Sequence, residues 1–269
     1  MQRFELFEFE DFKWFPKSLR NGITQLLEVL HQWLHTPDVV ANILEEEFNL
    51  SHNNIIVDIG SGSGGAMPAV LDKINSKESL DCQLILTDLY PNITLINHYQ
   101  NHAKINYHHL PINGNELEKA PDGIYTLMAC FHHFNPSQAL KILDSAQSNK
   151  KSILIYEIAI NNVPFLVWLF LLPISMIILF LMALVMTPFV KQKSLTILLF
   201  TYLIPIIPII YAWDGQASLK RTYTFKDIDE LLKKIPSEAD YAWQYKVALD
   251  RKGSKKGYYI IGQKNTYPI

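Results

Sequence analysis

The sequence predicts an α/β fold: a mostly parallel sheet that ends in an antiparallel pair of strands and is flanked by helices. Short apolar segments alternate with helical segments from residue 54 to residue 158, a pattern typical of parallel strands joined by right-handed crossovers. Near the end of the chain, two strand-like segments flank a turn-forming stretch at 250–254, which predicts a hairpin. With 269 residues, the chain is long enough for one large domain, or for a domain with an appendage.

The individual elements follow from the spacing of apolar residues. Ile23, Leu26 and Leu30 recur at helical spacing, so we expect a helix over 23–48 that forms either a cap on the core or a lid over the bound ligand. Strands and helices then alternate along the chain. We expect strands at 54–58, 83–88, 106–110, 123–130, 152–158, 241–249 and 258–263, and further helices from a glycine-rich loop to about 74 and at 92–102, 136–148 and 224–235.

Charge and cysteine content narrow the classes of partner. The chain has 24 basic and 26 acidic residues, and this balance does not favour nucleic acid as a partner. Its two cysteines, Cys82 and Cys130, predict a reducing compartment and no disulfide framework. The acidic N-terminus lacks the apolar core of a secretory signal. No Cys/His cluster has zinc-ligand spacing, so we expect no metal site.

A glycine-rich loop follows the first expected strand. Gly60, Gly62 and Gly65 let the backbone turn tightly and approach a ligand, and they also satisfy the dinucleotide pattern G-x-G-x-x-G. Asp88, at the end of the second expected strand, could accept hydrogen bonds from the ribose diol of a dinucleotide or of another nucleoside ligand. Asp58 favours a cationic ligand, because a carboxylate beside the loop repels a pyrophosphate by about 1 kcal/mol or more.

Three segments at the carboxyl ends of expected strands carry a family resemblance. They are Val57–Gly64 (VDIGSGSG), Leu86–Leu89 (LTDL) and Phe131–Phe134 (FHHF). With these segments the chain resembles class I S-adenosylmethionine-dependent methyltransferases, which implies a Rossmann-like sheet and that cofactor. Across nearly its whole length it resembles, more narrowly, a bacterial group of these enzymes, through Trp14–Arg20 (WFPKSLR), Thr201–Pro205 (TYLIP) and Trp213–Thr224 (WDGQASLKRTYT).

The resemblance also implies which residues hold the cofactor. The loop from Gly60 through Ser61 and Gly62 to Gly64, with Asp58 beside it, would cradle the methionine part. The ribose hydroxyls would bind Asp88, next to Leu89, and the adenine would lie beside Asn113, whose amide oxygen can accept from the adenine amino group. At the end of the fourth strand, Cys130 and Phe131 would border the cofactor.

Three residues at the same edge are candidates for catalysis. Methyl transfer needs alignment above all, and it needs a general base only when the acceptor loses a proton. His132 and His133 follow the fourth strand, and Glu157 ends the fifth. Each of the three has a structural alternative, a helix cap for the histidines and an ion pair for Glu157. Two further polar residues have weaker readings: Arg20 as a cofactor or surface contact, and Asp214 as part of a turn.

A long apolar block separates the fifth strand from the last helix. Between Val163 and Trp213 the only charges are Lys191 and Lys193. The length suffices for two membrane helices, but both ends join the catalytic part, and the lysine pair would then lie on the far side, against the positive-inside tendency. A hairpin that dips into one leaflet is favoured, and two spans or a soluble lid over a greasy pocket remain as alternatives.

Together these features predict a membrane-associated methyltransferase whose catalytic core faces the cytoplasm and whose acceptor is a hydrophobic small molecule or a lipid-like molecule. The rivals are a nicotinamide-dependent oxidoreductase and a membrane-tethered, non-catalytic cofactor binder. The sequence leaves open the methylated atom and the oligomeric state. We expect a helical cap at 1–50, the cofactor-binding core at 51–160, the hydrophobic hairpin or lid at 161–213 and the rest of the core at 214–269.

Overall fold

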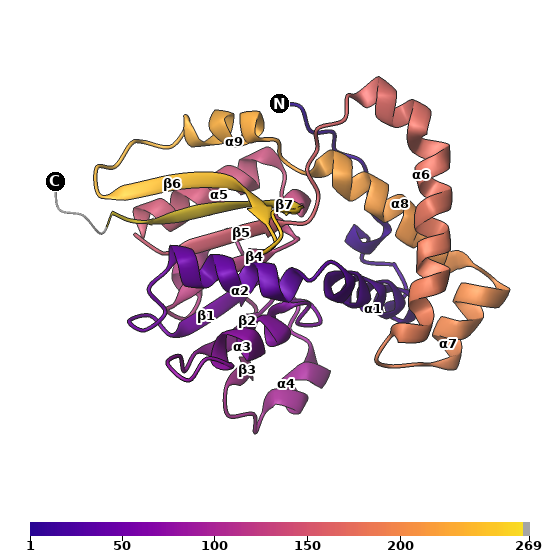
Figure 1. Cartoon of the computed structure of the whole chain (residues 1–269), viewed down its shortest axis with the longest axis horizontal. Helices are drawn as coiled ribbons and strands as arrows, with labels where there is room; N and C mark the ends of the chain where they lie inside the picture. The colour runs from indigo at the N-terminus through magenta and orange to yellow at the C-terminus, as the bar shows by residue number, and fades with distance from the viewer. Residues whose placement is uncertain (266–269) are drawn as a thin grey trace. The chain divides into compact units, whose positions relative to one another are not determined.

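The computed structural model describes residues 1–265, which divide into two compact units (Figure 1). The sheet unit comprises residue 1 and residues 35–159 and 225–265, and the helical unit comprises residues 2–34 and 160–224. The boundary at residue 34 divides the segment 1–50, for which we expected one cap. The four expected domains therefore stay a prediction, and each unit is described on its own.

The sheet unit is built on seven strands in the order β3-β2-β1-β4-β5-β7-β6. Strands β1 to β5 are parallel, and β7 is antiparallel to both β5 and β6, which confirms the predicted sheet and its C-terminal hairpin. The strand order reverses between β1 and β4, where sheets of this kind bind ligands. The strands are β1 (Ile55–Ile59), β2 (Gln83–Thr87), β3 (Ile105–Tyr107), β4 (Ile124–Met128), β5 (Ile153–Glu157), β6 (Tyr241–Leu249) and β7 (Lys255–Lys264).

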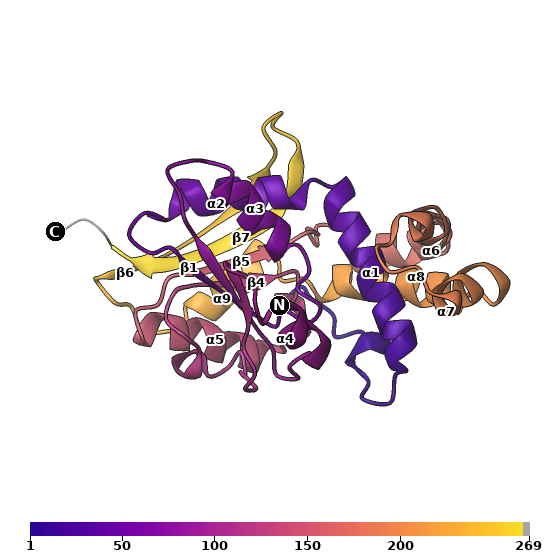
Figure 2. The ribbon, with the colours of Figure 1, turned by 90° about the horizontal axis from the view of Figure 1, so that it is seen from below.

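Helices cover both faces of this sheet, with α2 and α3 on one face and α5 and α9 on the other (Figure 2). Local sequence explains where they begin. Asn135 and Gln138 form a reciprocal capping box at the start of α5, and the Asn92 side chain accepts the first free N–H groups of α4. The bounds are α2 (Thr36–Glu47), α3 (Met67–Asn75), α4 (Ile93–Tyr99), α5 (Pro136–Ser148) and α9 (Phe225–Leu232), with short 3-10 turns η2 (Leu117–Lys119) and η3 (Phe131–His133).

The helical unit contains the N-terminal segment and the apolar block. Helix α1 is amphipathic, and its buried side chains, such as Ile23 and Leu26, pack with Met186 and Ile207 of the block. Figure 2 shows α1 along one side of the group formed by α6, α7 and α8. The elements are η1 (Phe9–Asp11), α1 (Lys17–Trp33), α6 (Phe165–Met186), η4 (Thr187–Phe189), α7 (Leu195–Leu198), the π-helical turn η5 (Leu199–Leu203) and α8 (Ile206–Arg221).

Two local expectations were wrong. The single helix expected over 23–48 is two helices, because His35 adopts a left-handed φ of 57° and Pro37 cannot continue a preceding helix. Asp214 lies inside α8 and not in a turn, although Gly215 follows it. Its Oδ1 accepts the Phe9 N–H at 2.9 Å, so this carboxylate joins α8 to the N-terminal segment.

One helix among the described residues, Phe165–Phe189, is long and apolar enough to cross a bilayer, with a mean hydropathy of 2.8. The pair Leu195–Leu203 and Ile206–Arg221 meets the same criterion only when taken together, and its two halves are bent by 79°. Length and composition alone do not distinguish a membrane span from a helix that lies on a membrane or packs against protein.

Candidate active site

The glycine loop begins where β1 ends, at the point of strand reversal. Gly60, Gly62, Gly64 and Gly65 all have positive φ, a backbone conformation in which other residues are strained. A methyl group added at Gly62 or Gly65 would meet no heavy atom within 4 Å. The loop therefore presents bare backbone to open space, as a cradle for a ligand requires.

Side-chain hydroxyls hold this loop against the end of β2. The Ser61 hydroxyl donates to the Asp58 carbonyl at 2.9 Å and accepts the Thr87 N–H at 3.1 Å. The Thr87 hydroxyl donates to the same Asp58 carbonyl at 2.9 Å. Tyr107, from β3, donates its hydroxyl to the Gly62 carbonyl at 2.9 Å. The loop is thus fixed before any ligand arrives, which lowers the entropy cost of binding.

The Asp58 carboxyl lies buried at the end of β1. Thr126 of β4 donates its hydroxyl to Asp58 Oδ1 at 2.7 Å. Burial, with a smaller contribution from the nearby Asp88, raises the pKa of Asp58 to about 7, although the hydrogen bonds from Ser61 and Thr126 act in the opposite direction. A nearby cation would favour the ionised carboxylate, so this group suits a positively charged ligand.

At the end of β2, Asp88 joins the glycine loop. Its Oδ2 accepts the Gly62 N–H at 2.9 Å, and its Oδ1 accepts the Tyr90 N–H at 2.7 Å. Both bonds orient the carboxylate beside the loop, where it remains half-buried. Leu89, predicted to lie beside the ribose, is 44% exposed and follows Asp88 directly.

The end of β4 turns sharply toward the end of β5. Ala129 has a φ of 50°, which costs a non-glycine residue about 1 kcal/mol, and its N–H donates to the Tyr156 carbonyl at 2.7 Å. The turn leads into η3, which carries both candidate histidines. Such strain at the carboxyl edge of a sheet is a mark of functional sites.

His132 and Glu157 form a buried pair at this edge. Glu157 Oε2 lies 2.9 Å from His132 Nδ1, and Oε1 accepts the His132 backbone N–H at 3.0 Å. A carboxylate on Nδ1 favours the tautomer with the proton there, so Nε2 carries the lone pair that can accept a proton. This is the arrangement of a general base with its orienting carboxylate.

Gly257 of β7 lies against the backbone that carries Glu157. A methyl group at Gly257 would lie 2.0 Å from the Glu157 carbonyl oxygen, and the φ of Gly257 is 101°. Only glycine fits this approach, so Gly257 helps to position the end of β5 and the carboxylate of the pair.

The remaining predicted residues lie nearby with fewer contacts. Cys130 Sγ is 3.7 Å from the Ile59 carbonyl, beneath the start of the glycine loop. The Asn113 Oδ1 accepts the N–H of Asn115 at 3.0 Å, in the segment that follows β3. The rings of His133 and His132 have centroids 4.3 Å apart. The assignment of these residues to a cofactor or a substrate stays a prediction.

Arg20 belongs to the helical unit, where its guanidinium caps the turn that precedes α1. It donates to the Glu10 carbonyl and, at 2.9 Å, to the Phe12 carbonyl. These bonds give Arg20 a structural role, and its contact with a cofactor carboxylate or in a surface salt bridge stays a prediction.

Sequence reasoning missed three residues of this edge. Thr126 and Tyr107 lie in strands, and their hydroxyls bind Asp58 and Gly62. A hydroxyl in the middle of the apolar segment 124–128 could have indicated the first. The third, Ala129, carries no signal in the sequence, because its unusual backbone results from the β4–β5 geometry.

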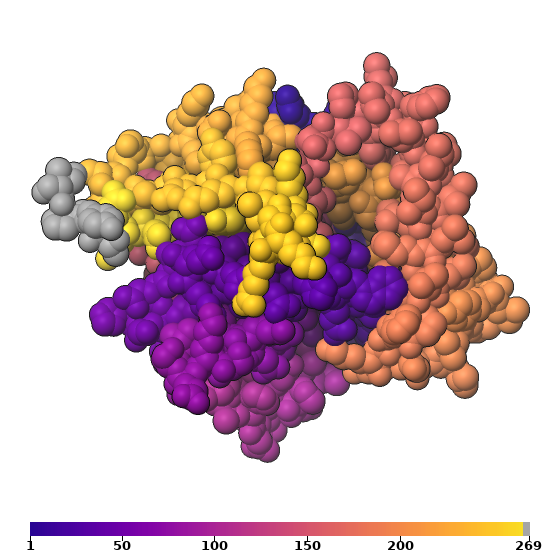
Figure 3. Space-filling view, viewed as in Figure 1, coloured from indigo at the N-terminus to yellow at the C-terminus, as the bar shows by residue number. Residues whose placement is uncertain are grey.

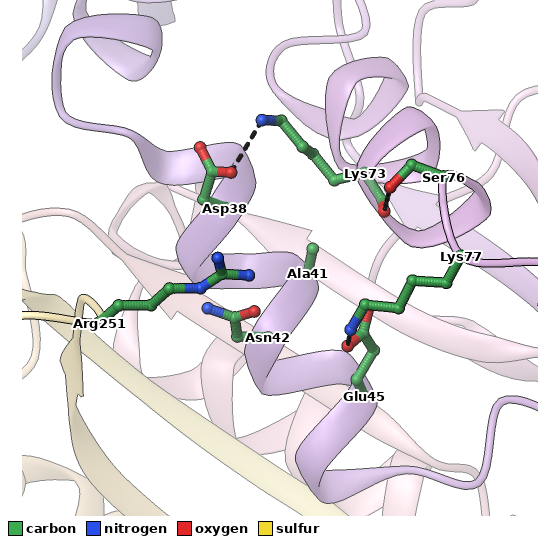
Figure 4. A pocket seen from close by; sticks show the side chains of 8 residues that line it. All are labelled: Asp38, Ala41, Asn42, Glu45, Lys73, Ser76, Lys77 and Arg251. Atoms are coloured by element: carbon green, nitrogen blue, oxygen red, sulfur yellow. Dashed lines mark hydrogen bonds and ion pairs between the residues drawn. The ribbon is translucent and has the colours of Figure 1, made fainter.

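A surface pocket lies elsewhere in the sheet unit, between α2, α3 and the β6–β7 turn (Figure 4). Its charges are largely compensated within it: Lys73 pairs with Asp38 at 2.8 Å, and Lys77 pairs with Glu45. Arg251 also lines it. None of its lining residues belongs to the glycine loop or to the carboxyl ends of the strands, so we assign it no role in the candidate site.

The residues at the carboxyl edge fit S-adenosylmethionine. The open space before Gly62 and Gly65 accommodates a ligand, the buried Asp58 suits a cation, and the carboxylate of Asp88 can accept from a diol. A pyrophosphate would instead lie between two carboxylates, which is unfavourable at short range.

Comparison with known proteins identifies the fold. No protein-family model and no curated protein matches the chain. Among solved structures, human N-acetylserotonin methyltransferase in complex with S-adenosylmethionine has a TM-score of 0.50 and 15% identity, over 93% of this chain and 56% of that one. OxaC in complex with S-adenosylhomocysteine and oxaline has 0.48 and 18%, over 85% and 47%. The plantazolicin methyltransferase BpumL has 0.46 and 12%, over 93% and 98%.

The chain spans little more than half the length of the human enzyme. Even so, the agreement with that structure extends over nearly all of this chain, and the strand order, the parallel β1–β5 and the antiparallel β7 agree with the expected sheet. The chain therefore has the fold of class I S-adenosylmethionine-dependent methyltransferases.

Proposed function

We propose that this protein is an S-adenosylmethionine-dependent methyltransferase that acts on a hydrophobic small molecule or a lipid-like acceptor. The observation that carries the proposal is one edge of the sheet on which a bare glycine loop, two carboxylates and a His–Glu pair occur together. The loop and Asp88 suit binding of the cofactor, and the pair suits deprotonation of an acceptor.

When bound, the cofactor supplies a methyl group that is already activated by its sulfonium. The chain's own residues then have two tasks, alignment and proton removal. His132 Nε2 takes the proton from the acceptor's O–H or N–H as the bond to the methyl carbon forms. Glu157 stabilises the resulting imidazolium through Nδ1, from 2.9 Å. The proton would remain on His132, and the methyl–sulfur bond would break with its electron pair left on the sulfur, so charge and atoms balance.

A hydrophobic acceptor is proposed from the position of the apolar block in the chain. The chain passes from Glu157 into α6, and none of the side chains from 163 to 190 is charged. Insertions at this point of a class I sheet commonly shape the acceptor site. The human enzyme with this fold is named for a small-molecule acceptor, N-acetylserotonin, and this agrees with a small-molecule acceptor here.

Membrane association belongs to the same proposal. Large apolar side chains are exposed along α6, among them Leu166, Phe170 and Ile178, which are 76%, 81% and 58% exposed. Exposed apolar areas of this extent mark contacts with lipid or with another protein. We place the protein on the cytoplasmic face of a membrane, in keeping with its two free cysteines.

The acceptor is tested by supplying S-adenosylmethionine with a labelled methyl group to a lipid extract of the host, together with the purified full chain. We expect label in an apolar product with the wild-type protein and none with G62R, whose arginine would enter the open space before the glycine loop. Label in neither reaction, or equal label in both, would contradict the proposed activity. Label confined to water-soluble products would retain the methyl transfer and reject the hydrophobic acceptor.

A further inference from the structure

We propose that α6, α7 and the apolar first part of α8 (residues 206–213) lie flat within one leaflet of a membrane, and that the amphipathic helix α1 packs against them. This mode of binding deepens the membrane association proposed above and rests on it. It concerns the helical unit alone, and it excludes a helix that crosses the bilayer.

The outer face of the helical unit is apolar along its whole length. Figure 3 shows α6 uncovered from end to end on the side in view. Among its exposed side chains, Phe170 is 81% exposed and Val185 is 59% exposed. The face continues onto α7 and η5, where Leu195 is 86% exposed and Leu203 is 75% exposed. An apolar face of this length needs a partner without polar groups.

A lipid surface fits this face better than a second copy of the chain. Protein interfaces carry about one hydrogen bond per 100–200 Å² and have a polar rim, whereas the segments 163–190 and 194–213 contain no charged residue. The cations Lys191 and Lys193 lie between these segments, and the Lys191 side chain is 68% exposed. Lysines beside an apolar face complement the anionic headgroups of a leaflet.

The start of α6 is held by polar contacts within the helical unit. Lys220 Nζ, at the C-terminal end of α8, donates to Asn161 Oδ1 at 3.0 Å and to the Val163 carbonyl at 2.5 Å. The Lys220 carbonyl accepts the Phe4 N–H at 2.9 Å. The start of α6, the end of α8 and the N-terminal segment therefore lie together.

The other end of α6 is held by α1. Lys191 Nζ lies 3.3 Å from Glu28 Oε2, and the Gln192 N–H donates to Gln25 Oε1 at 2.8 Å. Both Gln25 and Glu28 belong to α1. Both ends of α6 are thus connected to residues 2–34: the start through Lys220 to Phe4, and the end directly to α1.

This attachment excludes a span. The 22 residues of α6 measure about 33 Å along the axis, which is enough to cross a bilayer core of about 30 Å. If α6 crossed, the chain that joins its two ends would have to cross with it, and that chain carries Glu10, Arg20 and Glu28. Charged side chains at that depth are strongly unfavourable.

The segment that follows Lys193, residues 195–221, is also unsuited to crossing a bilayer. Leu195–Leu203 and Ile206–Arg221 meet at 79°, and the second helix carries buried polar side chains from Asp214 onward. Its apolar part, residues 206–213, spans only about 12 Å. A single layer of helices about 10 Å thick instead fits within one leaflet of about 15 Å.

Sidedness of labelling tests the proposal on the full chain. Asn162→Cys lies before α6 and Lys193→Cys lies after it, and both positions are exposed. We would treat intact spheroplasts and sealed inverted vesicles of a bacterial expression host with a membrane-impermeant maleimide, and use the unmutated chain to correct for Cys82 and Cys130. Both variants should react in inverted vesicles and neither in spheroplasts.

Reaction of the two variants from opposite sides would overturn the flat arrangement and leave membrane association in place. Failure of the wild-type chain to float with liposomes would overturn the membrane association itself. A second measurement does not depend on sidedness. Fluorophores attached at Phe170→Cys, Ile178→Cys and Val185→Cys should be quenched equally by lipids brominated at one depth, whereas deeper burial of position 178 alone would indicate a span and overturn the proposal.

Discussion

The two units of the molecule use polar and apolar side chains in opposite ways. In the sheet unit, the apolar side chains form an enclosed core, and polar groups such as Asp58, Asp88 and Glu157 gather at the carboxyl edge of the strands. In the helical unit, polar groups join the ends of the elements, and large apolar side chains such as Phe170 face outward. This difference agrees with the proposal that the sheet unit performs the chemistry and that the helical unit contacts a membrane.

Buried carboxyls occur in both units, but their partners differ. In the sheet unit, Glu157 pairs with His132, whose imidazole can take up or release a proton. In the helical unit, the permanently charged Arg221 pairs with Glu8 at 3.0 Å and with Asp11. Burial, together with Asp214 and Glu8, raises the pKa of Glu10 to about 8. The first arrangement suits proton transfer, and the second fastens the N-terminal segment to α8.

The largest expected effect is loss of cofactor binding in Gly62→Arg. The side chain would enter the open space before the loop, so binding of S-adenosylhomocysteine and methyl transfer should both fall below detection. Gly253→Arg is the matched control, because Gly253 also has positive φ and open surroundings but lies in the β6–β7 turn. Calorimetric titration of both variants measures the effect, and equal loss in both would point to backbone strain as the cause.

The next effect concerns the buried pair. Replacing His132 by Gln should lower kcat by about 10²- to 10⁴-fold, the usual contribution of a general base, and leave the Kd for S-adenosylhomocysteine nearly unchanged. Glu157→Gln should lower kcat less and shift the acidic limb of the pH–rate profile, because an amide cannot stabilise the imidazolium. A wild-type kcat in H132Q would show that His132 is not the general base.

A smaller effect should follow pH through Asp58. Since burial raises the pKa of this carboxyl to about 7, it is largely protonated at pH 6 and ionised at pH 8. A cationic ligand prefers the ionised form, so affinity for S-adenosylmethionine should weaken about tenfold from pH 8 to pH 6. The empty protein should show the opposite trend in stability. Its raised pKa means that the folded state binds more protons than the unfolded state between about pH 4 and pH 7, so its free energy of unfolding falls as pH rises through that window.

Asp58→Asn tests both trends at once. The variant should bind S-adenosylmethionine with an affinity that no longer depends on pH in this range, and its thermal unfolding should lose the same part of its pH dependence. Retention of both trends in the variant would assign them to other groups.

The smallest expected effect is a change in the helical unit that weakens membrane binding without altering cofactor binding in the sheet unit. Ile178→Ala, on the exposed face of α6, should weaken binding to liposomes about fivefold, because it removes about 1 kcal/mol of apolar burial, and should leave S-adenosylhomocysteine binding unchanged. Lys141→Ala on the exposed surface of α5 is the control and should alter neither. Flotation with liposomes gives the partition coefficients, and wild-type partition of I178A would argue against lipid contact through α6.

Much of the fold was predictable because its signals are local. The strand segments are short and apolar, and the ends of α5 and β6 lie where the sequence places them. The break between α1 and α2 was missed because apolar spacing continues across it, although Pro37 was a visible signal. The carboxyl-edge residues were identified because each follows an expected strand.

The contacts among those residues were not predictable. The His132–Glu157 pair depends on the turn at Ala129 and on the close approach of Gly257, both of which result from how β4, β5 and β7 come together. The attachment of Lys191 and Gln192 to α1 joins residues more than 160 positions apart. No local pattern encodes such a contact, and the proposed flat arrangement of the apolar block depends on it.

The most direct test of the proposed chemistry is a pair of calorimetric titrations of the purified full chain, one with S-adenosylhomocysteine and one with NADH. We predict saturable binding of S-adenosylhomocysteine, one molecule per chain, and no binding of NADH. Tight binding of NADH without binding of S-adenosylhomocysteine would contradict the assignment and favour an oxidoreductase on a similar sheet.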